Sequence, residues 1–367
     1  MPKTTPVSDG LFIGLMSGTS MDGADAVLVR FSPEFELLAS TSVAMPAPLH
    51  ALCLDLCEPG HNEIDRAGEA DRTLGHWFAE AAREVLAQAH VKPAEVCAIG
   101  SHGQTVRHRP GEGGFSLQLG SADVIASRTG ITTVANFRNR DMVLGGQGAP
   151  LVPAFHAGHF GRPGLRQAVV NIGGMANLTL LDGHTVVGGF DTGPGNVLLD
   201  LWHEKHQGES PDMNGYWAAS GKVDNTLLAT MLEDPYFKQA PPKSTGREYF
   251  NSDWLTLQIG NQSPRDVQAT LSQLTAASIA DALADFAPAR VLVCGGGAHN
   301  GDMMQRLQQC LGKIPCESTL EEGLSPDWVE ACAFAWLARA RLLGEPGNAP
   351  AVTGASAPAV LGAIYAP

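Results

Sequence analysis

Residues 168–196 have the sequence AVVNIGGMANLTLLDGHTVVGGFDTGPGN, and this stretch decides the fold expected of the chain. Residues 169–172 are mostly apolar and typical of a strand, and a glycine turn separates them from a second strand candidate at 177–181. After another turn, an apolar run at 185–190 leads directly into Asp191. The pattern predicts consecutive strands joined by glycine-rich turns.

The same plan occurs near the start of the chain. Residues 11–16 are apolar, residues 17–23 (SGTSMDG) form a turn, and residues 25–31 alternate as a strand does. Two copies of one hairpin, separated by about half the chain, indicate an internal duplication of an α/β lobe. The first turn can present amides and hydroxyls to a phosphate group, but it lacks the lysine of a P-loop, and such turns are often without function.

Asp191 belongs to the motif FDTGPGN at 190–196. Gly193 and Gly195 carry no side chain, so backbone N–H groups at this turn can approach a ligand closely. A carboxylate beside such a turn suits proton abstraction next to amides that hold phosphate oxygens. A simpler interpretation is that Asp191 only caps a helix that starts near Asn196.

Apolar periodicity predicts the other main elements, which are helices at 71–89, 267–286 and 327–343 and strands at 96–99, 131–135, 290–294 and 359–365. The strand at 96–99 runs into GSHGQT at 100–105. Polar residues at the carboxyl edge of a sheet are typical of ligand sites in α/β proteins, so His102, Gln104 and Thr105 are candidates for contacts with sugar hydroxyls. For His102 alone, a structural histidine is an equally good interpretation.

Two polar loops supply further candidates. Arg138 follows the strand at 131–135 and suits a carboxylate ligand, or else pairs with Asp141. The sequence GGQGAP at 145–150 is interpreted as a hinge, a ligand-approach loop or both, and its Gln147 is a candidate substrate contact.

A third polar loop, PPKSTGRE at 241–248, carries Lys243 and Arg247, although a solvated surface loop is the simpler interpretation. The strand at 290–294 runs into Gly295, Gly296 and Gly297 and then a helix. This arrangement is typical of nucleotide sites, but Asn300 breaks the dinucleotide pattern G-x-G-x-x-G.

Composition narrows the class of protein. The 367 residues suffice for two domains, and 44% hydrophobic with 17% charged residues is ordinary for a soluble globular chain. A net charge of −14 argues against binding to nucleic acid or to a membrane surface. The seven scattered cysteines favour reduced thiols in a cytoplasmic protein, and the histidine spacings do not favour a metal site.

The three glycine-rich regions, 17–23, 173–176 with 193–195, and 295–297, resemble the two phosphate loops and the adenosine loop of the actin-like ATPase superfamily. Five longer motifs strongly resemble the anhydro-N-acetylmuramic acid kinase family, namely GLMSGTSMDGAD at 14–25, SHGQT at 101–105, GGQGAP at 145–150, FDTGPGN at 190–196 and KSTGRE at 243–248. The resemblance covers residues 11–343. One departure is Asn136, where the family usually has Asp, and this puts any acidic role there in doubt.

The resemblance implies a two-lobed actin-like ATPase (ribonuclease-H-like) α/β fold with duplicated βββαβα lobes around a central cleft. We expect an N-terminal lobe at 1–160 and a C-terminal lobe at 161–367, with the option that the C-terminal segment returns to the first lobe. It also implies a cytoplasmic homodimer that takes a small-molecule sugar.

The implied activity is an ATP-dependent kinase that opens 1,6-anhydro-N-acetylmuramic acid with water and phosphorylates the 6-oxygen, in peptidoglycan recycling. Asp191 would be the base, and Glu330 a second carboxylate near the sugar. Mg²⁺ would bind mainly through ATP, with Asp22 or Asp25 holding its water shell. The implied nucleotide-binding residues are Gly18, Thr19, Ser20, Met21, Asp22, Gly23, Ala24, Asp25, Gly173, Gly174, Asn177, Gly193, Gly195, Asn196, Gly295, Gly296 and Gly297. His102, Gln104, Thr105, Arg138, Gln147, Lys243 and Arg247 would bind the sugar.

Two other functions compete with this interpretation. A sugar kinase of the same fold would phosphorylate an ordinary hydroxyl without consuming water. A chaperone-type ATP switch would need a peptide-binding module, and no linker followed by another domain is visible after residue 343.

Overall fold

The computed structural model describes residues 7–18 and 21–367. The chain forms two compact units, and the first contains residues 1–155 and 328–367 while the second contains residues 156–327. We expected lobes of residues 1–160 and 161–367, with the option that the C-terminal segment returns to the first lobe. In the structure the division lies between residues 155 and 156, and the last 40 residues pack within the first unit.

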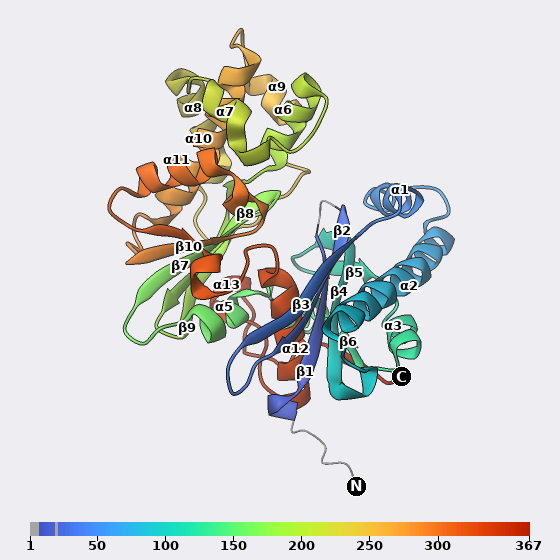
Figure 1. Cartoon of the computed structure of the whole chain (residues 1–367). Coiled ribbons are helices and arrows are strands. Elements are labelled where there is room, and N and C mark those ends of the chain that lie inside the picture. The colour runs from blue at the N-terminus through green and yellow to red at the C-terminus, as the bar shows by residue number, and fades with distance from the viewer. Residues whose placement is uncertain (1–6, 19–20) are drawn as a thin grey trace. The chain divides into compact units, whose positions relative to one another are not determined.

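The described part of the first unit contains a seven-stranded sheet in the order β12-β6-β4-β1-β2-β3, with β5 paired to β4 (Figure 1). Its strands are β1 (Leu11–Ser17), β2 (Gly23–Arg30), β3 (Glu36–Ala44), β4 (Val96–Arg109), β5 (Phe115–Leu119), β6 (Thr133–Ala135) and β12 (Ala363–Tyr365). β1, β2 and β3 are antiparallel neighbours, whereas β4 is parallel to β1 and β6 is parallel to β4.

The described part of the second unit contains a five-stranded sheet in the order β11-β10-β7-β8-β9. Its strands are β7 (Arg166–Ile172), β8 (Met175–Asp182), β9 (Thr185–Pro194), β10 (Arg290–Cys294) and β11 (Cys316–Ser318). Three antiparallel strands are again followed by two parallel ones, in the same spatial order as β3-β2-β1-β4-β6. The predicted α/β fold with duplicated lobes is confirmed.

Successive residues of β1 face opposite sides of the first sheet, and a helix covers each side. Ile13 and Leu15 are fully buried in a core shared with α2 (Glu63–Ala89). Gly14 faces the other side, where a Cβ atom would lie 1.8 Å from the carbonyl oxygen of Ala331 in α12 (Val329–Leu343). Glycine is required there because the helix backbone comes so close to the strand.

The second unit has its own hydrophobic core. Alternate residues of β7, Ala168, Val170 and Ile172, are fully buried against helices α6 (Val197–Gln207), α10 (Pro264–Leu283) and α11 (Gly301–Leu311). The other described helices are α1 (Ala47–Asp55), α3 (Ala122–Thr129), α4 (Arg138–Val143), α5 (Pro153–Phe160), α7 (Tyr216–Ser220), α8 (Asn225–Leu232), α9 (Ser252–Gln258) and α13 (Pro350–Thr353).

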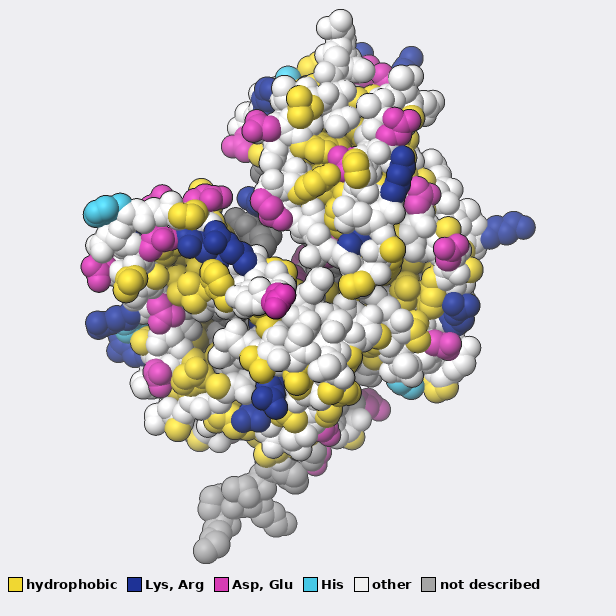
Figure 2. Space-filling model, turned by 180° about the vertical axis from the view of Figure 1, so that it is seen from behind, with side chains coloured by type: hydrophobic (Ala, Val, Ile, Leu, Met, Phe, Trp, Pro, Cys, Tyr) yellow, Lys and Arg dark blue, Asp and Glu magenta, His cyan; other side chains and the backbone are white. Residues whose placement is uncertain are grey.

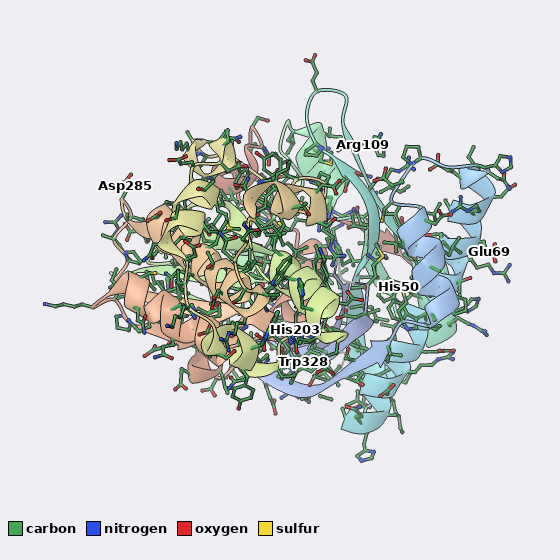
Figure 3. The ribbon with its side chains drawn as sticks, turned by 90° about the horizontal axis from the view of Figure 1, so that it is seen from above. His50, Glu69, Arg109, His203, Asp285 and Trp328 are labelled. Atoms are coloured by element: carbon green, nitrogen blue, oxygen red, sulfur yellow. The ribbon has the colours of Figure 1, made fainter. Side chains whose placement is uncertain are left out.

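Two strands are longer than expected, and both lengthen at the candidate site. β4 continues to Arg109, labelled in Figure 3, because β5 pairs with its second half, so GSHGQT lies within the strand and not beyond its end. β9 continues to Pro194, which pairs with Met175 of β8. Asp191 is therefore a strand residue and does not enter a turn.

No helix among the described residues is long and apolar enough to span a membrane. On the face drawn in Figure 2, Lys and Arg side chains are scattered among acidic and apolar ones.

Candidate active site

The first glycine turn is held by a buried glutamine. The Ser17 hydroxyl lies 2.7 Å from Gln104 Oε1 and 2.9 Å from the Gly23 carbonyl oxygen. Gln104 Nε2 donates to the carbonyl oxygens of Gly18 and Thr105, each at 3.2 Å. Gln104 is fully buried, so it joins the end of β1 to β4 and positions the turn. Thr19 and Ser20, two expected phosphate ligands, lie outside the described residues.

The rest of this turn leads into β2. Met21 is buried with a positive φ of 58°, and its N–H donates to the Gly18 carbonyl. Gly23, Ala24 and Asp25 are the first residues of β2, and Ala24 points into the core. Asp22 is exposed and Asp25 is half-buried, so both carboxylates border the turn.

Buried His102 and half-buried Arg138 form a pair. Arg138 Nη2 lies 2.6 Å from His102 Nε2, and Arg138 Nη1 donates to the Gly148 carbonyl at 2.7 Å. Burial and then the Arg138 charge hold the pKa of His102 well below its usual range, so the ring is neutral and Nε2 accepts. Its Nδ1–H has no hydrogen-bond partner among the described residues. The ring also packs against Phe334 of α12, with centroids 4.7 Å apart.

Arg138 is set up to attract an anion. Burial lowers the pKa of its guanidinium to about 10, and the negative charges of Glu330 and then Asp141 oppose that shift. The group therefore stays charged at neutral pH. Arg138 Nε is buried and has no partner among the described residues, which leaves a donor for a ligand. Glu330 at the start of α12 is half-buried and its charge acts on Arg138, so the structure brings these two candidates together.

Asp141 was expected at most to pair with Arg138, but it organises the GGQGAP loop. It is fully buried and accepts from the Gly148 N–H, the Asn348 amide and the Thr353 hydroxyl, each at 2.8 Å. A Cβ atom at Gly146 would lie 2.2 Å from Asp141 Oδ2. The glycines of this loop thus serve close packing around a buried carboxylate.

The remaining sugar candidates of this unit, Gln147 and Thr105, are both half-buried. Half-buried Gln147 belongs to the same loop, and its N–H donates to the Thr353 carbonyl at 2.8 Å. Thr105 Oγ1 accepts from Gln118 Nε2 at 3.1 Å. Asn136, the departure from the family sequence, is exposed with a φ of 58°. Asn and Asp both tolerate this left-handed conformation better than most residues, so the backbone there accepts the exchange.

Asp191 lies on β9 and is held at three atoms. Its N–H donates to the Lys243 carbonyl at 3.2 Å, its carbonyl accepts from the Tyr236 hydroxyl at 2.7 Å, and its Oδ2 accepts from the Thr245 N–H at 3.0 Å. The simpler interpretation as a cap of α6 is wrong, because the carboxylate bonds to residue 245 and not to the start of that helix.

Burial raises the pKa of the Asp191 carboxyl to about 6. The Thr245 N–H and the Lys243 charge act in the opposite direction, whereas the nearby Glu248 charge adds to the increase. A carboxylate with a pKa near 6 is a stronger base than an exposed one and is still ionised at neutral pH. Such a group suits general-base catalysis.

The two cations of the KSTGRE loop differ in their surroundings. Lys243 is half-buried, and its Nζ donates to the carbonyl oxygens of Tyr236 at 3.1 Å and Phe237 at 3.4 Å. Arg247 is exposed, and its charge acts on Asp200 of α6. Arg247 thus remains accessible to a ligand from solvent.

The second glycine turn and the start of α6 bind one another. The N–H groups of Gly195 and Asn196 donate to the carbonyls of Gly174 and Gly173, at 2.9 Å and 2.8 Å. A Cβ atom at Gly195 would lie 2.3 Å from the Gly173 oxygen. These two amides therefore fix the turn against the helix. Among the other expected residues, Gly193 is buried with a φ of 153°, and Asn177 pairs with Asp191 across the strands.

The third glycine stretch lies against the end of β7. Cβ atoms at Gly295 and Gly297 would lie 2.2 Å from Asn171 Oδ1 and 2.3 Å from Ile172 Cγ2. Gly296 is exposed, and a Cβ atom there would be 3.8 Å from Asn196 Nδ2. The structure thus brings the second turn, the start of α6 and the third glycine stretch together. Asn171 Oδ1 is buried there without a hydrogen-bond partner among the described residues.

Sequence reasoning missed Tyr236, Thr245 and Asn171 as members of these sites and considered Asp141 only as a partner of Arg138. Thr245 lies in a motif that the sequence singled out, and its backbone N–H rather than its side chain holds Asp191. Tyr236 occurs in the segment DPYFK, which contains no glycine turn or known motif. Its role depends on the hydrogen bond from its hydroxyl to the Asp191 carbonyl, 45 positions away, and no local sequence pattern predicts such a contact.

Comparison with known proteins places the chain in a family. The family model described as "Anhydro-N-acetylmuramic acid kinase" matches residues 10–367. A protein of that name from Saccharophagus degradans is 49% identical, over 97% of this chain and 99% of the relative. Another from Shewanella sp. (strain ANA-3) is 51% identical, over 96% and 98%. A solved activator of the 2-hydroxyisocaproyl-CoA dehydratase from Clostridium difficile is 12% identical with a TM-score of 0.48, over 90% of this chain and 94% of that one. The chain therefore belongs to the anhydro-N-acetylmuramic acid kinase family and is a phosphotransferase with an alcohol group as acceptor.

Proposed function

We propose that the protein uses ATP and water to convert 1,6-anhydro-N-acetylmuramic acid into N-acetylmuramate 6-phosphate and ADP. The family name supports the sugar and the phosphoryl transfer, and the environment of Asp191 supports the participation of water. Such a reaction belongs to the cytoplasmic recycling of cell-wall peptidoglycan.

The reaction balances with one general base. The Asp191 carboxylate takes a proton from water, and the water oxygen forms a bond to the anomeric carbon. The bond from that carbon to the 6-oxygen breaks, and the 6-oxygen bonds to the γ-phosphorus as the bond to the ADP oxygen breaks. The leaving oxygen needs no separate acid, because the phosphoryl group captures it.

The single observation that carries this proposal is the placement of Asp191. Its carboxyl is held by the Thr245 N–H at 3.0 Å, and its pKa is raised to about 6 by burial. A general base in the correct protonation state typically contributes 10²–10⁴-fold to a rate. A carboxylate with a structural role alone would gain nothing from a raised pKa.

The described residues fit a nucleotide with a magnesium ion held mainly by phosphates. No cluster of three or more His, Cys, Asp or Glu side chains suited to a metal occurs in the described ranges. Mg²⁺ is usually held by one or two carboxylates together with phosphates and water, and Asp22 and Asp25 are two carboxylates at the first glycine turn. When bound, the ion would neutralise charge on the phosphates.

Backbone groups and small residues of glycine-rich turns would hold the nucleotide. We assign the phosphates to the turn from Gly18 to Asp25 and to Gly173, Gly174, Gly193 and Asn177. The exposed Gly296 would lie against adenosine. Because the Gly195 and Asn196 amides bond within the protein, we assign these residues to shaping the turn.

The sugar would be bound by Arg138 and the neutral His102 ring of the first unit. Arg138 Nε is a buried donor without a hydrogen-bond partner among the described residues, which suits an oxygen of an amino sugar that carries a carboxylate. Glu330 would lie near the reacting end of the sugar. Gln147 and Thr105 are further contacts in this assignment, and exposed Arg247 of the second unit stays a candidate for the sugar.

Isotope labelling in water tests the proposal. The purified protein, ATP, magnesium and the anhydro sugar are incubated in H₂¹⁸O, and the product is examined by mass spectrometry. We expect one ¹⁸O atom at the anomeric position and ADP release that exceeds the rate with N-acetylmuramate or glucose. Phosphorylation without ¹⁸O uptake would instead identify a sugar kinase that deprotonates an ordinary hydroxyl.

A further inference from the structure

We propose that Lys243 is a positioning residue whose ammonium group closes residues 236–245 into a loop that holds the base Asp191. This proposal rests on the function proposed above and replaces the expectation that Lys243 binds the sugar. Four contacts within the second unit carry it.

The first three contacts fix Asp191 to this segment. The Tyr236 hydroxyl donates to the Asp191 carbonyl, the Asp191 N–H donates to the Lys243 carbonyl, and the Thr245 N–H donates to Asp191 Oδ2, at 2.7, 3.2 and 3.0 Å. Both backbone polar groups of the base and one carboxylate oxygen are therefore held by residues that lie 45 to 54 positions away in sequence.

The fourth contact closes the segment on itself. Lys243 Nζ donates to the carbonyls of Tyr236 and Phe237, at 3.1 and 3.4 Å. It also lies 4.7 Å from the Tyr236 ring centroid and 5.7 Å from that of Phe190, the neighbour of the base. A half-buried ammonium between two aromatic rings gains cation–π attraction as well as hydrogen bonds. Its donors are directed into the protein, which does not suit a residue that recognises substrate.

The charged surroundings of Asp191 make the role measurable. Glu248 and Lys243 act on its carboxyl with opposite signs, and among the described residues the titratable hydroxyl of Tyr236 also interacts with its charge. Across the sheet, the neighbour on β8 is uncharged Asn177. Loss of the Lys243 charge therefore raises the pKa of Asp191, whereas loss of the Glu248 charge lowers it.

The test compares Lys243→Met, Lys243→Arg and the control Lys238→Met. Lys238 is exposed in the same segment, so its variant removes a charge without touching the loop contacts. We expect Lys243→Met to lower kcat by about 10–100-fold, the scale of a small misplacement of a catalytic group, with KM for the sugar within about 2-fold. The acidic limb of the kcat/KM profile moves to higher pH, Lys243→Arg restores much of the rate, and Lys238→Met behaves as the wild type.

A substrate-binding lysine would give another result. A KM for the sugar raised about tenfold or more with kcat unchanged, or no change in any parameter, would overturn the proposal. Glu248→Gln should shift the acidic limb to lower pH, and a shift in the same direction as that of Lys243→Met would also contradict it.

A readout without turnover separates this proposal from the proposed function. The carboxyl ¹³C signal of Asp191, assigned by its loss in Asp191→Asn, is titrated in wild type, Lys243→Met and Lys238→Met. A higher pKa in Lys243→Met alone supports the proposal even if the wild type opens no anhydro ring, and equal pKa values refute it.

If Lys243→Met does not fold, Tyr236→Phe tests the same loop. It removes the hydroxyl that holds the Asp191 carbonyl, and Tyr249→Phe is the matched control because Tyr249 is exposed and bonds to Asp234 instead. We expect a lower kcat and a shifted Asp191 carboxyl signal for Tyr236→Phe only. Identical rates and spectra in both variants would overturn the proposal.

Discussion

Asp191 makes the folded protein less stable at neutral pH, because its folded-state pKa of about 6 lies above the ordinary value of 3.8. The folded state binds this proton more tightly than the unfolded state does. Stability therefore falls as the pH rises from about 4 to 6, and the cost is complete above that range. A shift of about two pKa units corresponds to at most about 3 kcal/mol.

We expect Asp191→Asn to be inactive, because it lacks the base, and more stable than the wild type, because it lacks the buried charge. The amide oxygen still accepts from the Thr245 N–H, but it cannot take a proton from water. We expect turnover to be lost, nucleotide binding to persist, and the melting temperature to exceed that of wild type above pH 6. The difference should shrink toward pH 4, as measured by thermal unfolding across pH.

Asp285→Asn is the matched control, since Asp285 is an exposed carboxylate of the same unit, labelled in Figure 3. It should change neither activity nor the pH dependence of melting. An Asp191→Asn protein with near-normal turnover would remove Asp191 as the base. Equal melting curves of Asp191→Asn and wild type at every pH would contradict the buried-carboxylate argument.

For single residues, the sequence predicted which polar side chains are important but not which groups they bond to. Gln104 was expected to bind a sugar. Its Nε2 instead donates to the Gly18 and Thr105 carbonyls, and its Oε1 accepts from the Ser17 hydroxyl. Lys243 was expected to face a ligand, yet its donors serve Tyr236 and Phe237. Residue type indicates what a side chain can bond to. Which group is within reach depends on contacts between distant parts of the chain.

Helices and strands were more predictable than contacts, because their periodicity is local. The strand predicted at 290–294 has the bounds of β10, Arg290–Cys294, and the hairpins at both glycine turns are present. The short strand β5 was missed, since it depends on pairing with β4. Helix α2 starts at Glu63, earlier than the predicted residue 71. The prediction missed its first two turns because they are largely exposed and lack the apolar stripe.

Gly100 shows how one missing side chain lets an element pack. A Cβ atom there would lie 2.0 Å from the Phe334 carbonyl oxygen of α12, so the helix backbone would have to move. We expect Gly100→Ala to lower the free energy of unfolding by about 1–3 kcal/mol or more, the usual cost of overpacking. Urea unfolding followed by circular dichroism measures the change.

The matched control is Gly68→Ala in α2. Gly68 is exposed, and a Cβ atom there would meet nothing within 4 Å. Alanine is favoured over glycine inside a helix, so this variant should gain about 0.5–1 kcal/mol. If Gly100→Ala were as stable as Gly68→Ala, close packing of α12 on β4 would not be what fixes glycine at position 100.

The two units of the molecule differ in the number of chain segments that form them. The second unit is one continuous segment, 156–327, whereas the first unit needs both 1–155 and 328–367. Periodicity and repetition predicted two lobes and left open whether the C-terminal segment belongs to the first or the second, and the last 40 residues lie in the first. That assignment depends on α12 fitting the glycines of β1 and β4, which is a contact between the two ends of the chain.

This connectivity predicts which fragments fold. Residues 156–327 contain a complete five-stranded sheet and its core, so the isolated segment should unfold cooperatively and give dispersed NMR spectra. Residues 1–155 lack α12, which covers the sheet face at Gly14 and Gly100, and lack β12, which pairs with β6. We expect this fragment alone to remain loosely packed or to aggregate.

A fusion protein in which a flexible Gly/Ser linker joins residues 1–155 to 328–367 is compared with the 1–155 fragment. This fusion restores α12 and β12, so it should regain a cooperative thermal transition that the 1–155 fragment lacks. Gly100→Ala placed in the fusion should lower that transition, because the same helix-to-strand contact is disturbed. A 1–155 fragment as cooperative as the fusion would mean that the first sheet is stable without its covering helix.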